Sequence, residues 1–244
     1  MHKGIFKMMT NDPKILNGLK EFDTATVFNA VEELIKSTEA GSAPDGTGIH
    51  PLNYTGPEII SLNPELGNAI GTVVTAEVTT NDPDSEKINW DEYYDTLDST
   101  PGPIIAVIKD VDSRPGRGAS FGDGMARRHR LLGVTGAVIE GTVRDIAGIT
   151  EVGLPIWAKG KVPGHGVFNL ISVNRPVTAG QLIIYPGEII IADMDGCTKI
   201  PKGHDPVTVL ETAKEIRRRE NQGKSKFSTP GFTVEDWKRQ RKTS

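Results

Sequence analysis

The sequence contains a single cysteine, Cys197, among its 244 residues. One cysteine cannot form a disulfide within the chain, and the sequence contains no cysteine and histidine cluster with the spacing of a common zinc site. A lone cysteine is typically a small buried apolar residue, because an unactivated thiol is a weak nucleophile. We therefore expect Cys197 to be structural rather than catalytic.

The sequence also lacks long apolar runs and a strong excess of either charge. No segment approaches the roughly 18 consecutive apolar residues of a membrane span, and the first residues, MHKGIFKMMTNDPK, lack the apolar run of a secretory signal. The 28 Lys and Arg residues are balanced by 32 Asp and Glu residues, which does not favour nucleic acid or an anionic membrane as a partner. We expect a globular cytoplasmic protein without nucleic-acid or membrane partners.

Apolar periodicity predicts alternating strands and helices in the middle of the chain. Strands are expected at 70–78, 104–108, 136–140 and 156–158, and helices at 26–34, 89–98, 124–132, 146–152 and 207–219. Loops or turns are expected at 37–64, 110–120, 141–145 and 159–165, and a hairpin at 182–192. Such alternation is typical of a parallel sheet, which binds ligands at the carboxyl ends of its strands.

A turn with the sequence Gly122-Asp123-Gly124 precedes the helix expected at 124–132. It is not a nucleotide loop, because Phe121 stands where the G-x-G-x-x-G motif needs glycine, and no G-x-x-x-x-G-K-[ST] occurs. The N–H groups of Gly124 and Met125 at the helix start are suited to bind a carboxylate. Asp123 beside them is either part of this site or a simple helix cap.

A second charged turn, Arg144-Asp145, follows the strand expected at 136–140. An arginine in this position can bind a carboxylate or stabilise an enolate oxygen, and the aspartate can hold a hard cation such as Mg²⁺. The alternative is a surface charge pair.

His165 lies in a loop that could approach the site, although a lone histidine has no partner assigned by sequence. For Asp193-Met194-Asp195-Gly196 a structural turn is favoured over a calcium site, because the other oxygen ligands of an EF-hand loop are missing.

Three consecutive motifs carry a resemblance to a known family. They are GD-x-M-A from Gly122, G-V-x-G-x-V-I-x-G-x-V-R-D over 133–145, and G-x-P-I-x-A-x-G over 153–160. Together they resemble the family that contains regulator of ribonuclease activity A and the 4-hydroxy-4-methyl-2-oxoglutarate and 4-carboxy-4-hydroxy-2-oxoadipate aldolases. The resemblance spans most of residues 20 to 200. The sequence departs from the family pattern at Glu140 and Glu188, where the family commonly has aspartate.

The resemblance implies an α/β fold of the swivelling β/β/α type, like that of phosphohistidine domains, with three layers. It implies a catalytic domain over residues 1–200 and a C-terminal helical extension over 201–244 that packs on a neighbouring subunit. It further implies a homotrimer or homohexamer with the site at a subunit interface.

The resemblance also implies a role for each residue of the two turns. Asp145 would hold a divalent metal, Mg²⁺ or Mn²⁺, and Arg144 would bind substrate and stabilise the enolate of pyruvate. Asp123 would orient a water molecule on the metal that acts in proton transfer. The turn Gly122-Asp123-Gly124 and the Met125 amide would receive the substrate carboxylate.

The family's aldolases use a further glutamate from the C-terminal region of a neighbouring subunit. Glu220 is our choice for this metal ligand, with Glu215 and Glu211 as alternatives. The expected activity is a lyase that cleaves a 4-hydroxy-2-oxo acid, a di- or tricarboxylate, to pyruvate and a second carbonyl compound, with possible oxaloacetate decarboxylation. The alternatives are a non-catalytic regulator that binds a ribonuclease or an RNA helicase, and a related sugar-acid enzyme with the same enolate chemistry. The regulators lack the C-terminal glutamate.

Overall fold

A computed structural model describes residues 12–38 and 53–243 of the chain. The part of the loop expected at 37–64 that spans 39–52 lies outside the described residues, as do residues 1–11. The strands are β1 (Ile60–Ser61), β2 (Ala69–Thr79), β3 (Ile104–Asp110), β4 (Ala119–Phe121), β5 (Val134–Val143), β6 (Ile156–Lys161), β7 (Asn169–Val173), β8 (Val177–Ala179), β9 (Leu182–Ile184), β10 (Ile189–Asp193) and β11 (Gly196–Ile200). The helices are α2 (Pro13–Lys20), α3 (Thr24–Thr38), α4 (Trp90–Ser99), α5 (Asp123–Leu131), α6 (Ile146–Val152), α7 (Pro206–Phe227) and α8 (Val234–Thr243), with a short 3-10 helix at Pro64–Leu66.

The centre of the fold is a nine-stranded mixed sheet in the order β1-β6-β5-β3-β2-β10-β11, with β4 beside β5 and β7 beside β2. Strands β2, β3, β5 and β6 run parallel, as the alternation of strand and helix predicted. Strands β2, β3 and β5 are rich in β-branched residues and largely buried, which is typical of a parallel sheet covered on both faces, whereas the second half of β6 is not buried. Antiparallel strands β1, β7 and β10 flank this parallel core.

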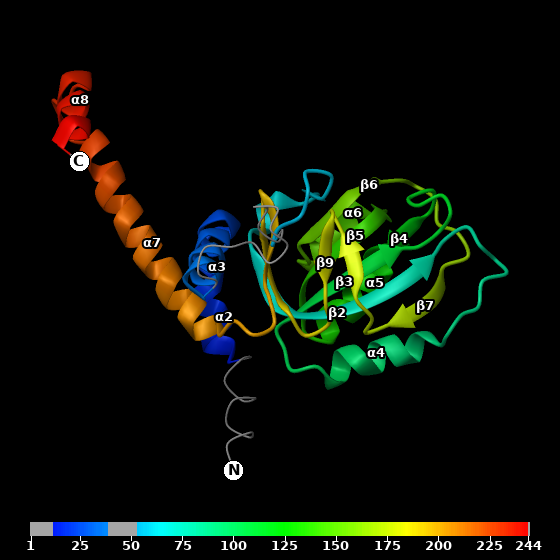
Figure 1. The fold of residues 1–244 in the computed structure, drawn as a ribbon. Coiled ribbons are helices and arrows are strands. Elements are labelled where there is room, and N and C mark those ends of the chain that lie inside the picture. Colours follow the sequence, from blue (N-terminus) through cyan, green and yellow to red (C-terminus); the bar gives the residue numbers. More distant parts are fainter. Residues whose placement is uncertain (1–11, 39–52, 244) are drawn as a thin grey trace, which may run out of the picture.

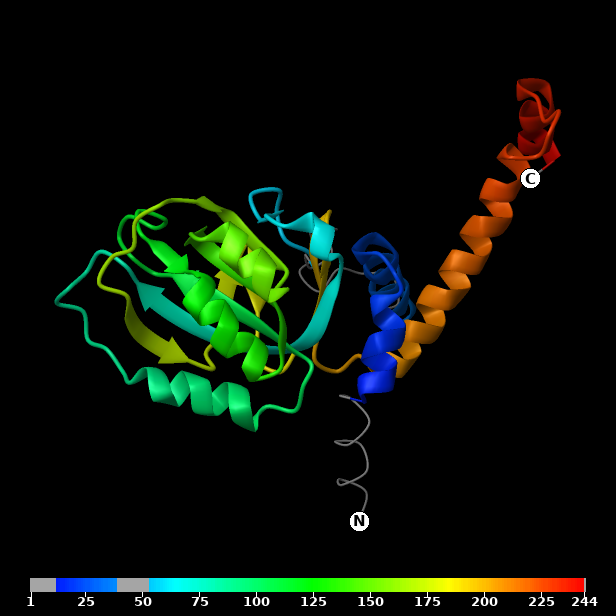
Figure 2. The ribbon, with the colours of Figure 1, turned by 180° about the vertical axis from the view of Figure 1, so that it is seen from behind.

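Helices α4, α5 and α6 cover one face of the sheet, as Figure 2 shows from behind. Their apolar side chains, among them Tyr93, Met125 and Ile149, form one core cluster with β2, β3 and β5. The small sheet of β8 and β9 covers the other face (Figure 1), where Trp157 is fully buried. The Trp157 indole donates to the carbonyl of Asp193 at 2.6 Å, so its polar group is satisfied within the core.

A separate apolar cluster joins α2, α3 and the first half of α7 to β10 and β11. The remainder of α7 and α8 then project away from the body of the molecule as an arm (Figure 1). The helix expected at 207–219 is therefore longer than predicted. Asp193 ends β10 at the start of the turn to β11 and accepts hydrogen bonds from the N–H and hydroxyl of Thr24 at 2.7 and 2.8 Å. These contacts confirm a structural turn at Asp193–Gly196.

Four sequence predictions about local structure are wrong. The segments at 182–192 do not form a hairpin, since β9 pairs with β8 while β10 pairs with β2 and β11. The reason is that Val73 of β2 bonds to the backbone of Gly187 and Glu188, at 2.9 and 2.8 Å, and so binds the turn to the large sheet. Strand β5 continues to Val143, which reduces the expected turn at 141–145 to two residues. Similarly, β6 continues to Lys161, and β4 forms within the segments expected to be loops.

Candidate functional site

The two charged turns are brought together because β4 and β5 run parallel and end side by side. Phe121 pairs with Val143, and the N–H of Arg144 donates to the carbonyl of Phe121 at 3.0 Å. The residues that follow the two strands, Gly122 and Arg144, are therefore neighbours at the carboxyl end of the sheet. This is the edge at which parallel sheets commonly bind ligands.

A pocket of about 290 Å³ opens at this edge. Its walls combine charged groups with apolar side chains, and they come from β4, the start of α5, the turn after β5 and the loop after β6. The lining residues are Ala119, Phe121, Gly122, Asp123, Gly124, Met125, Arg128, Arg144, Asp145, His165 and Phe168. All five residues of the two turns, together with Met125, line this one pocket.

Asp145 has an unusual backbone conformation for its position. It precedes α6 with φ 59° and ψ 39°, in the left-handed region, and its side chain makes no capping hydrogen bond to the helix. An aspartate at such a position ordinarily caps the helix. Because Asp145 does not, its carboxylate is available for another partner. Oδ2 of Asp145 lies 3.2 Å from Nε of Arg144, and the two side chains are 44 % and 37 % exposed, so both remain accessible to a ligand.

Gly122 allows this carboxylate to come close to the start of α5. A Cβ atom at position 122 would lie 3.2 Å from Oδ2 of Asp145 and 3.4 Å from Cγ of Arg144. The backbone at Gly122 is extended, with φ −153° and ψ −177°, a conformation that any residue can adopt. Glycine is therefore favoured here by its missing side chain and not by its backbone freedom.

Asp123 is the first residue of α5 and does not cap it, because the capping position belongs to Gly122. The simple-cap interpretation is therefore wrong, although a carboxylate in the first turn still interacts favourably with the helix dipole. Oδ2 of Asp123 lies 3.9 Å from Arg127, and α6 passes closely because Gly148 has no side chain. A Cβ at Gly148 would lie 2.8 Å from the Cβ of Asp123.

The N–H groups expected to bind a carboxylate are only partly available. Within the described part of the chain, the N–H of Gly124 has no acceptor, whereas the N–H of Met125 donates to the carbonyl of Gly122 at 3.1 Å. The prediction that the Met125 amide points outward is thus not met. In a short first turn the third amide already reaches back to the capping residue. Gly124 is left as the amide that faces the pocket.

Two buried side chains, His129 and Tyr93, form a chain of hydrogen bonds with the backbone of the first turn of α5. His129 Nδ1 lies 2.8 Å from the carbonyl oxygen of Met125, and Nε2 lies 2.8 Å from the hydroxyl of Tyr93. Because a carbonyl can only accept, Nδ1 carries the proton and Nε2 accepts from the tyrosine. Both side chains are fully buried, and this burial lowers the pKa of His129 to about 4, so the ring is neutral.

The sequence did not single out Arg128 and Phe168, although both line the pocket. Arg128 follows Gly124 by four residues on one helix, a spacing that places the two residues on the same face. This spacing could have predicted that Arg128 lies near the pocket. Phe168 has φ 59° and stacks on Trp90 with ring centres 4.9 Å apart, a long-range contact without any local signal. His165 does reach the pocket, where its Nδ1 lies 2.9 Å from the carbonyl of Gly166.

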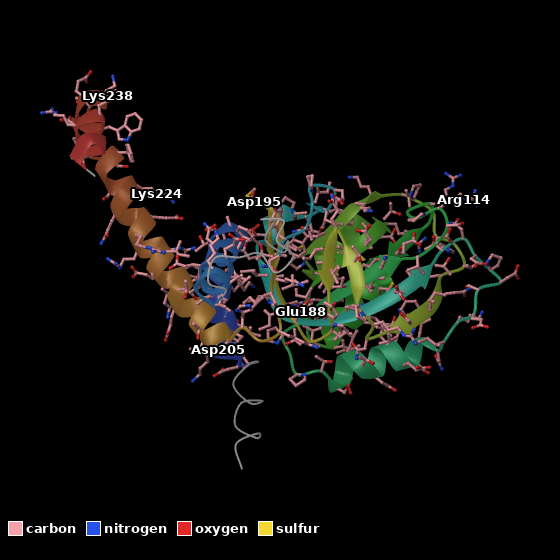
Figure 3. The ribbon with its side chains drawn as sticks, viewed as in Figure 1. Arg114, Glu188, Asp195, Asp205, Lys224 and Lys238 are labelled. Carbon is pink, nitrogen blue, oxygen red and sulfur yellow. The ribbon has the colours of Figure 1, made fainter. Side chains whose placement is uncertain are left out.

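Other candidates lie away from the pocket. Glu220 pairs with Lys224 at 3.0 Å and Glu215 with Arg218 at 2.6 Å, both on α7. Figure 3 shows Lys224 on the projecting arm, at the end of the molecule opposite to Arg114 in the loop between β3 and β4. Strand β2 points away from the arm (Figure 1), and β3 and β5 run parallel to β2. The pocket at the carboxyl end of β5 is therefore far from the arm of its own chain.

Cys197 and the two departures from the family pattern have structural surroundings. Cys197 is buried, and this burial raises the pKa of its thiol, which disfavours the nucleophilic thiolate. Glu140 pairs with Lys159 and accepts from the N–H of Gly180 at 2.8 Å. Glu188 accepts from Lys199 at 3.3 Å. Neither glutamate lines the pocket.

The pocket residues are compatible with a hard divalent cation. Asp123 and Asp145 supply carboxylate oxygens, and Mg²⁺ commonly binds through one or two carboxylates and keeps several waters. The absent side chain at Gly122 leaves room beside the Asp145 carboxylate. In the residues that the structure describes, no three His, Cys, Asp or Glu side chains gather to hold a metal.

Comparison with known proteins identifies the family. The family model described as RraA-like, Aldolase/RraA, matches residues 39–198. The chain belongs to the Aldolase/RraA family. This family includes both 4-hydroxy-4-methyl-2-oxoglutarate aldolases and RraA regulators, so membership alone is compatible with a lyase or with a non-catalytic protein.

Among its relatives is a protein of Halalkalibacterium halodurans whose name provisionally assigns it as a 4-hydroxy-4-methyl-2-oxoglutarate aldolase. It is 32 % identical over 201 residues, which cover 80 % of this chain and 84 % of the relative. This similarity favours a lyase.

Two solved structures share the fold. One is an uncharacterized protein from Pseudomonas syringae, 21 % identical over 92 % of this chain and 96 % of that chain, with a TM-score of 0.68. The other is a Streptomyces coelicolor protein described as an unusual member of the RNase ES inhibitor RraA protein family, 22 % identical over 87 % of this chain and 96 % of that chain, with a TM-score of 0.65. They confirm the predicted α/β fold class. None of the described helices is long and apolar enough to cross a membrane.

Proposed function

We propose that this Aldolase/RraA family member is a divalent-metal-dependent pyruvate aldolase, a lyase that cleaves a 4-hydroxy-2-oxo acid to pyruvate and a second carbonyl compound. The observation that carries this proposal is the convergence of four groups on one pocket, namely Arg144, Asp145, Asp123 and the N–H of Gly124, which has no acceptor among the described residues. Aldol cleavage needs these functions together, namely a cationic group at the 2-oxo oxygen, a proton acceptor and a carboxylate binder.

The reaction develops negative charge at the 2-oxo oxygen. The 4-hydroxyl loses its proton, the bond between C3 and C4 breaks, and its electron pair moves through C3 to form the enolate of pyruvate. A proton then returns to C3. The Arg144 guanidinium beside the oxygen stabilises this charge more strongly in the transition state than in the bound substrate, which is the condition for catalysis.

The other pocket residues hold the substrate and move the proton. The Gly124 N–H at the start of α5 binds the C1 carboxylate, with the helix dipole favouring the negative charge. Asp123 holds a water molecule that accepts the proton of the 4-hydroxyl. Asp145, with its carboxylate free of a capping role, would hold Mg²⁺ or Mn²⁺, which supplies Lewis-acid polarisation when bound.

We further propose a homotrimer or homohexamer in which the extension over 201–244 reaches a neighbouring subunit. Glu220 lies on an arm that leaves the body at the end opposite to the pocket, so it can serve only the site of another copy. Glu215 and Glu211 are alternatives on the same helix. The sequence suits a cytoplasmic location.

The proposal is tested by incubating the purified protein with Mg²⁺ and a panel of 4-hydroxy-2-oxo acids and oxaloacetate, and measuring pyruvate. We expect release of pyruvate that stops when the metal is chelated. Arg144→Ala should abolish turnover, whereas Arg114→Ala, at an exposed loop outside the pocket, should keep it. The absence of pyruvate from every compound would reject the aldolase and favour the regulator, which would then be tested by binding to a ribonuclease or RNA helicase.

A further inference from the structure

Arg128 is a pocket cation that the proposed chemistry does not use. In the described part of the chain no carboxylate pairs with it, although its neighbour Arg127 pairs with Glu151 at 3.5 Å and Arg144 pairs with Asp145. Its recorded contacts are the carbonyl of Gly124, 3.3 Å from Nη1, and the half-buried Tyr94. A guanidinium has five N–H donors, so most of those on Arg128 remain available to a ligand.

The position of Arg128 along α5 defines which part of a ligand it can reach. Helical side chains point back toward the N-terminus, and the contact with Gly124 shows that this one does so. The Gly124 carbonyl points along the helix away from the Gly124 N–H, and Nη1 of Arg128 lies 3.3 Å from the carbonyl oxygen. The guanidinium therefore lies on the order of 5 Å from the amide that binds the first carboxylate. The two carboxyl carbons of an extended five-carbon diacid are about 5 Å apart, given C–C bonds of ~1.5 Å.

The same pocket also has apolar walls. Met125, Phe121 and Phe168 line the same pocket and present carbon surface to a ligand. The loop that carries Phe168 is attached to the sheet, since the Ala119 N–H donates to the Gly164 carbonyl at 2.8 Å and the Val167 N–H donates to Thr80 at 2.9 Å. The pocket therefore suits a short carbon chain with an anionic group at each end.

We infer that Arg128 is a specificity-determining residue that binds a second carboxylate of the substrate, at the end away from the C1 carboxylate. Its planar fork forms paired, charge-assisted hydrogen bonds with that group. This inference rests on the proposed function for the identity of the ligand as a 2-oxo acid. It assigns the discrimination between dicarboxylic and monocarboxylic substrates to one side chain of α5.

The test compares the binding of 2-oxoglutarate with that of 2-oxopentanoate, which has the same five carbons and a methyl group in place of the second carboxylate. Affinities are measured by calorimetry for the full chain with Mg²⁺. We expect the wild-type protein to prefer 2-oxoglutarate by about 10- to 100-fold, the range for hydrogen bonds between charged groups. Arg128→Met should reduce the preference to less than ~3-fold by weakening only 2-oxoglutarate, and Arg128→Lys should retain part of it.

Arg130→Met is the matched control, because Arg130 lies on the same helix outside the pocket and contacts the Val134 carbonyl at 3.2 Å. It should keep the wild-type preference. Circular dichroism and thermal melting establish that the variants are folded. An unchanged preference in Arg128→Met, an equal loss for both ligands, or no preference in the wild-type protein would each overturn the assignment.

The outcomes also separate this inference from the proposed function. Preference for 2-oxoglutarate that depends on Arg128, in a protein that releases no pyruvate from any substrate, would support the binding role and reject the aldolase. Pyruvate release with equal use of mono- and dicarboxylic substrates by the wild type and by Arg128→Met would support the aldolase and reject the role of Arg128.

Discussion

Replacing Gly122 by alanine tests the arrangement of the site without changing any charged group. The added Cβ would lie 3.2 Å from Oδ2 of Asp145 and 3.4 Å from Cγ of Arg144, both shorter than comfortable contacts. These atoms must therefore move by a few tenths of an ångström. Because misplacement by about 1 Å costs on the order of 100-fold in rate, we expect kcat/KM to fall by roughly 10-fold.

The stability of the protein should not fall with this change. The backbone at Gly122 is extended, a conformation that alanine adopts without strain, and alanine reduces the entropy of the unfolded chain. We expect the free energy of unfolding to be unchanged or higher by up to about 1 kcal/mol. Gly160→Ala is the matched control, because a Cβ there meets no atom of the described residues within 4 Å.

The assay combines steady-state pyruvate release with the affinity for Mn²⁺ measured by electron paramagnetic resonance. Both activity and Mn²⁺ affinity should fall in Gly122→Ala and remain in Gly160→Ala. Wild-type kinetics and Mn²⁺ binding in a folded Gly122→Ala protein would refute the reasoning, because the Asp145 carboxylate would then not be part of the reacting site.

Three further predictions concern the surroundings of the pocket. Gly148→Ala would place a Cβ 2.8 Å from that of Asp123, so kcat/KM should fall by about 10-fold in steady-state assays; unchanged kinetics would remove Asp123 from the site. The pKa of His129 is about 4 in the folded protein against an ordinary value of about 6.5, so the unfolded chain binds the proton first as pH falls. Stability is therefore full above pH 6.5, and urea unfolding should show a loss of about 2 kcal/mol by pH 5, at ~1.4 kcal/mol per unit, that His129→Gln lacks; an equal loss in the variant would contradict the buried neutral ring. Cys197 should react with a thiol reagent only after unfolding, and stoichiometric labelling of the folded protein at pH 8 would show that its thiol is accessible.

The fold follows from the sequence wherever a segment carries its own signal. Signals such as the continuous apolar run of β3 and the glycine that ends α6 are part of the strand and helix alternation that predicted a parallel core. The prediction failed where a strand chooses between partners, as with β9 and β10. Both are short apolar strands, and the turn between them is bound to β2 by Val73, a contact between residues distant in sequence.

The candidate site was predictable in its polar residues and less so in its walls. Gly122, Asp123, Arg144 and Asp145 stand in two turns at strand ends, where local sequence already implies a position at one edge of the sheet. Phe168 comes from a segment far along the chain and depends on stacking against Trp90. No local sequence pattern predicts such a contact.

By itself, the sequence determined the alternation of strands and helices, the two charged turns and the resemblance to a family, because these depend on residue type and spacing along the chain. The tertiary structure decided that Arg128 and His165 join the pocket and that Glu220 lies at the opposite end of its own chain. It also decided that the Asp145 carboxylate leaves its helix uncapped and is available to a ligand. The pocket depends on how the ends of β4, β5 and β6 lie beside one another, and the position of Glu220 depends on how α7 packs on α2 and α3. Both are set by contacts between residues distant in sequence.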